Sequence, residues 1–204
     1  GGGLMYLALY EIMNSKVALG WVANRYRVHQ RLRMAYRDEP RLLFRIEEHD
    51  GNFRILAQST CQPDWQDAFG NFDVLVGTPA VKELRLGNLM PGGYYHFRLV
   101  ANPVVTRNRK RLGLFKEEAQ VEWSKRQLER SGSVVMQSQA RQLGLMRSAK
   151  NPAKDGNPQT HYAVEFNGVL QVLNVKLLSK RMIEGIGPAK AYGFGLLTLA
   201  KFNA

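Results

Sequence analysis

The chain has 204 residues, enough for one compact domain or two small ones but not for a large multidomain enzyme. Its 29 Lys and Arg against 17 Asp and Glu give a formal net charge of +12, while 45% hydrophobic and 23% charged residues are ordinary for a folded protein. The cationic excess therefore belongs on a folded surface, and it favours a polyanion as the partner.

Cysteine and histidine are scarce, which limits the possible chemistry. The single cysteine, Cys61, excludes an internal disulfide framework and a Cys-based zinc site, and it fits a reducing cytoplasm. Four scattered histidines favour neither a metal site nor a metal cofactor, and we expect no cofactor. No apolar run reaches the roughly 18 residues of a membrane span, so we expect a soluble protein. Residues 1–4 precede Met5 and are interpreted as an expression remnant outside the fold.

The first half of the chain reads as strand, helix, strand, strand, short helix and strand. The predicted ranges are 5–12, 21–36, 42–47, 53–58, 64–69 and 81–86. This is the β-α-β-β-α-β order of a ferredoxin-like domain.

The predicted helix over 21–36 has two adjoining faces. A buried stripe is predicted from Trp21, Val28, Leu32 and Ala35. The adjoining arc is cationic and holds one imidazole; it comprises Arg25, Tyr26, His29, Arg33 and Tyr36.

The second half repeats the same order after a boundary at 91–93. Strands are predicted over 94–103, 134–136, 162–166 and 195–199, and helices over 116–130 and 174–184. The polar, turn-rich stretch 142–160 is expected to be a mobile loop. We therefore expect an α+β protein of two ferredoxin-like domains, 5–90 and 91–204, each with an antiparallel sheet.

Basic residues gather between a predicted strand and a predicted helix. The run Arg107, Asn108, Arg109, Lys110 and Arg111 is expected to form a protruding loop whose cations meet phosphates, and Lys125, Arg126 and Arg130 follow on the helix. The alternative is a solvated surface without a partner.

Tyr26 and His29 are spaced i, i+3, so they are neighbours on the predicted helix. Histidine exchanges protons near neutral pH, and Arg25 and Arg33 one turn away would hold a phosphate beside it. The alternative is a histidine that only packs or hydrogen-bonds. His49, His96 and His161 are expected to be structural.

A glycine-rich segment, Gly185 to Gly195, lies between the last predicted helix and strand. Its backbone amides suit phosphate, and Lys190 adds a charge, but it is neither a Walker loop nor a dinucleotide fingerprint. The alternative is a tight connection that needs glycine. Since no aspartate-rich set of a two-metal nuclease is present, an enzyme acting on nucleic acid would use the RNA 2′-hydroxyl instead of metal.

Several segments resemble, in the same order, the CRISPR repeat-RNA endoribonucleases of the CasE family, the processing subunit of the subtype I-E Cascade complex. They are Met5-Tyr-Leu7, Tyr26-Arg-Val-His29-Gln-Arg-Leu32, Phe97-Arg-Leu-Val-Ala-Asn-Pro103, Val164-Glu-Phe-Asn-Gly-Val-Leu170 and the glycine-rich ending Gly185 to Ala200. The resemblance covers nearly the whole chain from Met5.

The resemblance implies two ferredoxin-like domains that bind the repeat stem-loop, cut at its 3′ base without metal, leave a 2′,3′-cyclic phosphate and remain in Cascade with its other subunits. It places the family's helix histidine at His29 and its tyrosine at Tyr26. Lys150 and Lys154 are candidates for the assisting loop lysine, with Lys154 taken as catalytic and Lys150 as RNA-binding.

The RNA-binding set implied by the basic clusters and the resemblance has ten members: Arg25, Arg33, Arg107, Arg109, Lys110, Arg111, Lys150, Gly187, Lys190 and Gly193. Whether His29 acts as acid or base stays open. A non-catalytic RNA-hairpin-binding subunit is the alternative function. A DNA-binding architectural protein is a weaker reading, because no recognition-helix motif stands out.

Overall fold

The computed structural model describes residues 3–70, 73–151, 153–154 and 158–203. The first unit contains one four-stranded antiparallel sheet in the order β2-β3-β1-β4. Its elements are β1 (Leu4–Ile12), α1 (Lys16–Ala23), α2 (Arg25–Ala35), β2 (Leu43–His49), β3 (Asn52–Ser59), α3 (Trp65–Phe69), β4 (Ala80–Arg85) and the short turn η1 (Leu86–Asn88).

The second unit contains another four-stranded antiparallel sheet, in the order β10-β5-β9-β8. Its elements are β5 (Tyr94–Ala101), α4 (Glu117–Glu129), β8 (Ser133–Ser148), β9 (Gln159–Val172), α5 (Val175–Glu184), the turn η2 (Lys190–Tyr192) and β10 (Leu197–Lys201). The hairpin of β6 (Val104–Arg107) and β7 (Lys110–Gly113) is inserted after β5. Numbered within its own unit, each sheet has the strand order 4-1-3-2, so the expected tandem ferredoxin-like arrangement is confirmed.

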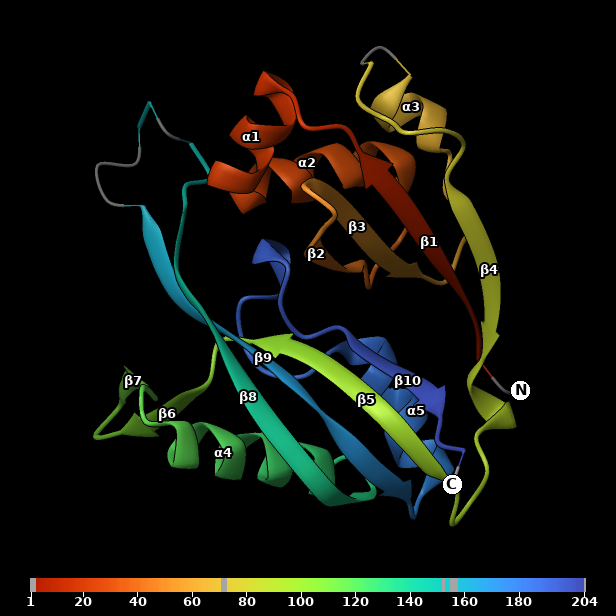
Figure 1. Ribbon diagram of the computed structural model, residues 1–204, viewed down its shortest axis with the longest axis vertical. Helices are drawn as coiled ribbons and strands as arrows, with labels where there is room; N and C mark the ends of the chain where they lie inside the picture. Colours follow the sequence, from red (N-terminus) through yellow and green to blue (C-terminus); the bar gives the residue numbers. More distant parts are fainter. Residues whose placement is uncertain (1–2, 71–72, 152, 155–157, 204) are drawn as a thin grey trace.

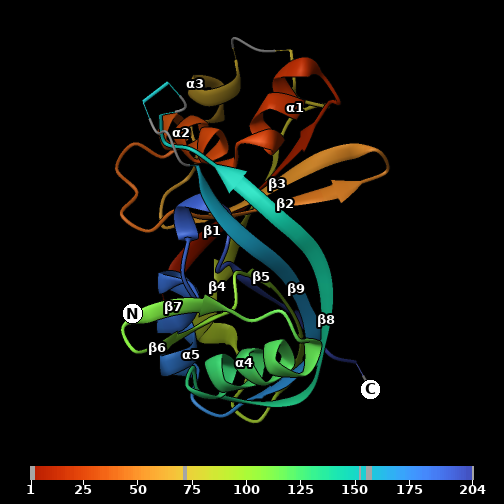
Figure 2. The ribbon, with the colours of Figure 1, turned by 90° about the vertical axis from the view of Figure 1, so that its left-hand side faces the viewer.

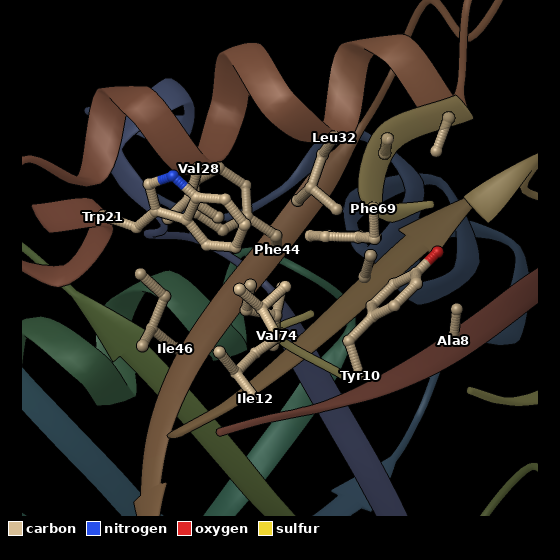
Figure 3. Packing of buried hydrophobic residues seen from close by; sticks show 14 of the residues in the cluster. Ala8, Tyr10, Ile12, Trp21, Val28, Leu32, Phe44, Ile46, Phe69 and Val74 are labelled. Atoms are coloured by element: carbon tan, nitrogen blue, oxygen red, sulfur yellow. The ribbon is translucent and has the colours of Figure 1, made fainter. Parts of the chain in front are cut away.

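The helices lie on the outer sides of the molecule, with α1, α2 and α3 at one end and α4 at the other (Figures 1 and 2). Figure 3 shows the first core, where Trp21, Val28 and Leu32 point from the helices toward Phe44 and the sheet. These three residues and Ala35 are all buried, so the predicted apolar stripe is confirmed. Within the described residues, no helix is long and apolar enough to cross a membrane.

The prediction of a single helix over 21–36 is wrong, because the chain forms two helices, α1 and α2, that meet at Asn24. The Ser15 hydroxyl accepts from the Ala18 backbone N–H at 3.1 Å and starts α1 five residues earlier than expected. Asn24 is extended, with φ −134° and ψ 91°, and it breaks the helix before Arg25. Arg25 and Tyr36 are also buried, because Arg25 lies three residues before Val28 and Tyr36 lies four after Leu32, on the buried face of α2.

The expectation of a mobile loop over 142–160 is wrong for residues 142–148 and 159–160, and part of the stretch between them lies outside the described residues. Strand β8 continues to Ser148, and β9 begins at Gln159, with Arg147 paired to Thr160 in an antiparallel ladder. Most of the exposed residues of β8 and β9 are polar, and their sequence therefore resembles that of a loop. At the other end of the chain, β1 begins at Leu4, which pairs with Arg85, so the first strand includes one residue that was expected to lie outside the fold.

Arg45 joins the two sheets. This side chain on β2 is only 3% exposed, and its guanidinium donates to the Glu47 carboxylate at 2.8 Å and to the Thr198 hydroxyl of β10 at 3.0 Å. It also reaches the carbonyls of Leu196 and Arg98 at 3.3 and 3.4 Å. A buried charge is tolerated only with such partners, so Arg45 fixes the placement of the second sheet against β2.

Gly168 on β9 is a position where the sheet has no room for a side chain. A Cβ there would lie 1.9 Å from the carbonyl oxygen of Gln137, beside the irregular pairing of β8. We therefore expect Gly168→Ala to lower the free energy of unfolding by about 1–3 kcal/mol or more, measured by urea denaturation. The matched control is Gly20→Ala in α1, where the new methyl meets only the end of Arg27 at 3.6 Å and should be neutral or stabilising. Equal stability of the two variants would contradict this account of the sheet.

Candidate active site

His29 lies in the middle of α2 and is half-buried. Its ring stacks at 6.3 Å on Phe44 of β2, and its Nδ1 atom is buried with no hydrogen-bond partner among the described residues. Burial lowers the pKa of His29, and the charges of Arg33 and Lys150 lower the pKa further. The imidazole is therefore neutral at pH 7 and able to accept a proton.

Tyr26 is the centre of an aromatic cluster around this imidazole. Its ring lies 5.5 Å from that of His29 and 5.7 Å from that of Tyr192 in the glycine-rich segment. The predicted contact of Tyr26 with His29 is confirmed. The ammonium of Lys150 lies 5.9 Å from the Tyr26 ring centroid, within reach of a cation–π interaction.

Asn24 holds the segment that carries Lys150. Its side-chain amide donates to the Ala149 carbonyl at 3.0 Å and accepts from the Ala149 N–H at 3.2 Å. The residue that breaks the helix thus also anchors the end of β8 beside α2. Lys154 is exposed and lies in a turn, where its N–H donates to the Asn151 carbonyl at 3.0 Å. The structure brings Lys150, and not the predicted Lys154, to the described cluster.

The two arginines expected beside His29 differ in position. Arg33 is half-buried, donates to the Glu39 carbonyl and acts on the imidazole through its charge. Arg25 is 7% exposed, and burial lowers its pKa to about 10. Arg25 is therefore not on an exposed arc, because it lies three residues before Val28 on the buried face of α2. Its contact with RNA stays a prediction.

The glycine-rich segment packs tightly against the first unit. Gly193 has φ 86°, and a Cβ there would lie 3.0 Å from the Phe44 ring. Gly187 has φ 81° and approaches the Trp123 ring equally closely. The alternative of a tight connection that needs glycine therefore describes this segment.

The amide expected to cradle phosphate at Gly193 is already engaged, since it donates to the Lys190 carbonyl at 3.3 Å, and the residue is buried. The phosphate contact of Gly193 stays a prediction, and it would require this amide to leave the Lys190 carbonyl. Lys190 is half-buried, and burial together with the charges of Arg181 and Arg41 lowers its pKa.

The basic run forms a separate, exposed hairpin. Its turn is made by Asn108 and Arg109, with φ 49° and 64°, and every residue from Arg107 to Arg111 is exposed. Figures 1 and 2 show β6 and β7 projecting from the second unit next to α4. The expected protruding cationic element is confirmed as a structure.

Sequence reasoning missed two members of the cluster. The His161 ring on β9 lies 4.7 Å from Tyr192, and its Nδ1 is buried. Tyr192 lies in the glycine-rich segment, where the glycines alone suggest a function and nothing marks the tyrosine. Nothing in the local sequence marks His161, because its place depends on the pairing of β9 with its neighbours. Among the residues that the structure describes, no group of three or more His, Cys, Asp and Glu is arranged to hold a metal ion.

Comparison with known proteins identifies the family. A family model described as "CRISPR associated protein" matches residues 5–201. This chain belongs to that family. The CRISPR-associated endoribonuclease Cse3 of Thermus thermophilus is 30% identical over 204 residues, covering 91% of this chain and 94% of that protein. The Cascade subunit CasE of Escherichia coli is 30% identical over 203 residues, covering 90% and 96%.

The fold agrees with that of a solved member of the family. Thermus thermophilus Cse3, bound to an RNA representing a pre-cleavage complex, superposes with a TM-score of 0.81 at 28% identity. The match covers 96% of this chain and 98% of the other. A CRISPR-associated chain of this fold therefore places a neutral imidazole, a tyrosine and two cations together.

The placement of Lys150 predicts a shift in the titration of His29. Removing the ammonium in Lys150→Gln relieves its repulsion of the imidazolium, so the pKa of His29 should rise toward its ordinary value. NMR titration of the RNA-free protein, with the signal assigned through His29→Asn, measures this. Lys154→Gln is the matched control and should leave the pKa of His29 unchanged. If the pKa of His29 shifted in Lys154→Gln but not in Lys150→Gln, Lys154 would be the lysine next to His29.

Proposed function

We propose that this protein is a metal-independent endoribonuclease that binds the CRISPR repeat stem-loop and cuts at its 3′ base to make crRNA. It then stays bound to the cleaved hairpin with the other Cascade subunits. The observation that carries the proposal is the half-buried imidazole of His29, which contacts Tyr26 and is kept neutral by burial and by the charges of Arg33 and Lys150. The family membership of the chain supports the choice of RNA.

The reaction needs an internal nucleophile and a base. His29 takes the proton from the 2′-hydroxyl, and the 2′-oxygen attacks the adjacent phosphorus. The bond from phosphorus to the 5′-oxygen breaks, and the 5′-oxygen takes a proton from water. The hydroxide left behind takes the proton back from His29, and the products are a 2′,3′-cyclic phosphate and a 5′-hydroxyl. Tyr26 orients the sugar, while Arg33 and Lys150 offset the negative charge that develops on the phosphorane. Lys150, and not Lys154, takes the assisting role because of its contact with Tyr26.

The exposed basic hairpin would grip the RNA stem. Arg107, Arg109, Lys110 and Arg111 stand on an element that departs from the sheet, and their charges suit the phosphates of an A-form helix, whose deep, narrow groove hides its bases. Gly187 and Lys190 remain candidates for contacts nearer the cut. The domains are assigned to 5–90 and 91–204, and the place of action to the cytoplasm, where repeat transcripts are made.

Cleavage of a labelled repeat hairpin in EDTA tests the chemistry. Wild type should cut without metal, and His29→Ala should cut about 10²- to 10⁴-fold more slowly while still binding. An RNA with 2′-deoxy at the scissile nucleotide should bind and stay intact. Tight binding by wild type without any cleavage would instead identify a non-catalytic hairpin-holding subunit.

The pH profile separates the two roles of His29. As a base, His29 must be neutral, so the single-turnover rate should rise with pH through its pKa, below the ordinary value, and then stay level. A rate that falls as pH rises through that pKa would make His29 the acid on the 5′-oxygen.

Charge reversal tests the hairpin. Arg109→Glu combined with Arg111→Glu should weaken stem-loop binding. The slope of the logarithm of the binding constant against the logarithm of the salt concentration should become shallower by about one for each phosphate that the hairpin no longer binds. Lys82→Glu combined with Arg85→Glu on β4 changes the net charge equally, away from the hairpin, and serves as the control. An unchanged salt slope in the Arg109 and Arg111 variant would show that the hairpin is a solvated surface that does not touch RNA.

A further inference from the structure

A groove of about 450 Å³ lies between the basic hairpin and the glycine-rich segment, and it adjoins the cluster around His29 at His161. We call it the hairpin groove. Its walls come from β7, from the start of β9 and from the residues before η2, and they include Arg111, Phe115, Tyr162, His161 and Ala189. Asn102 and Gln159 add polar groups, and none of the described residues that line it is acidic.

Phe115 is an aromatic ring that the fold holds at the surface. It is 65% exposed, yet its ring meets that of Tyr162 at 5.0 Å in an edge-to-face contact of 72°. On its other side it covers Gly113, where a Cβ would lie 3.1 Å from the ring. Phe115 is therefore an exposed, apolar platform in the same groove as the cation of Arg111.

The groove leads toward the proposed site of cleavage. His161, on its wall, contacts Tyr192 at 4.7 Å, and Tyr192 contacts Tyr26 at 5.7 Å. The buried Nδ1 of His161 has no hydrogen-bond partner in the described part of the chain. A ligand bound in the groove would therefore have the basic hairpin on one side and the His29 cluster on the other.

A flat aromatic platform, an arginine and neutral amides are the groups that bind a nucleobase within a nucleic acid strand. The stem itself offers no free base, because paired bases stack on each other. We propose that the hairpin groove binds an unpaired nucleobase next to the foot of the stem, stacked on Phe115 and hydrogen-bonded by Asn102 or Gln159. This rests on the proposed function, and it adds a single-strand subsite that positions the scissile linkage.

The test compares two RNAs, a repeat hairpin that is blunt at the foot of its stem and the same hairpin with its flanking single strands. Phe115→Leu should weaken binding of the extended RNA by roughly 5- to 100-fold, the loss expected for one base–aromatic stack, and leave the blunt hairpin unchanged. Phe202→Leu is the matched control, since Phe202 is also exposed but contacts His96 in a tilted arrangement at the end of β10, away from the hairpin groove. Thermal unfolding shows whether both variants are folded.

A fluorescent base locates the contact. With 2-aminopurine placed in turn at each unpaired position beside the stem, wild type and Phe202→Leu should quench one position, and Phe115→Leu should not. Equal affinities of Phe115→Leu and wild type for the extended RNA, or equal losses for both RNAs, would overturn the subsite while leaving the proposed function standing. If wild type binds neither hairpin, the proposed function fails first and the subsite fails with it.

Discussion

The close approach of Gly193 to Phe44 is the contact on which the candidate site depends. Phe44 is fully buried on β2, with the His29 ring stacked on it at 6.3 Å and Gly193 against its ring edge, where no Cβ fits without displacement. The glycine-rich segment of the second unit thereby packs on Phe44, the residue that supports the imidazole. Tyr192, next in the chain, then meets Tyr26 of the first unit. The adjacent Arg45 points to the opposite face of β2 and fixes the second sheet.

The electrostatics of the site follow from this packing. Burial and the nearby cations favour the neutral imidazole, which lowers the pKa of His29. The same charges of Arg33 and Lys150 would stabilise a phosphorane, whose negative charge they face. A neutral base among fixed cations suits a reaction that begins with a proton transfer and passes through an anion. In the proposed reaction, the net charge of +12 would serve the approach of RNA, while these two cations would serve the chemical step.

Local patterns predicted the order of most strands and helices and the central pair of residues. The alternation of strands and the spacing of Trp21, Val28 and Leu32 reflect which faces are buried, and the i, i+3 spacing alone placed Tyr26 beside His29. The rest depends on tertiary contacts. Asn24 breaks the helix while its side chain holds Ala149, 125 residues away, and this anchor lies next to Lys150, the lysine that contacts Tyr26. Long-range β pairing likewise brings His161 to Tyr192, which no local pattern shows.

Single-turnover cleavage by Gly193→Ala, with hairpin affinity measured in parallel, tests the dependence on Phe44 most directly. The new methyl must displace the Phe44 ring behind His29, so the cleavage rate should fall while hairpin affinity is kept. Gly92→Ala is the matched variant, because Gly92 also has a positive φ, 77°, but nothing lies within 4 Å of its Cβ position. We expect Gly92→Ala to cleave at the wild-type rate. A folded Gly193→Ala that cleaves as fast as Gly92→Ala would contradict the account.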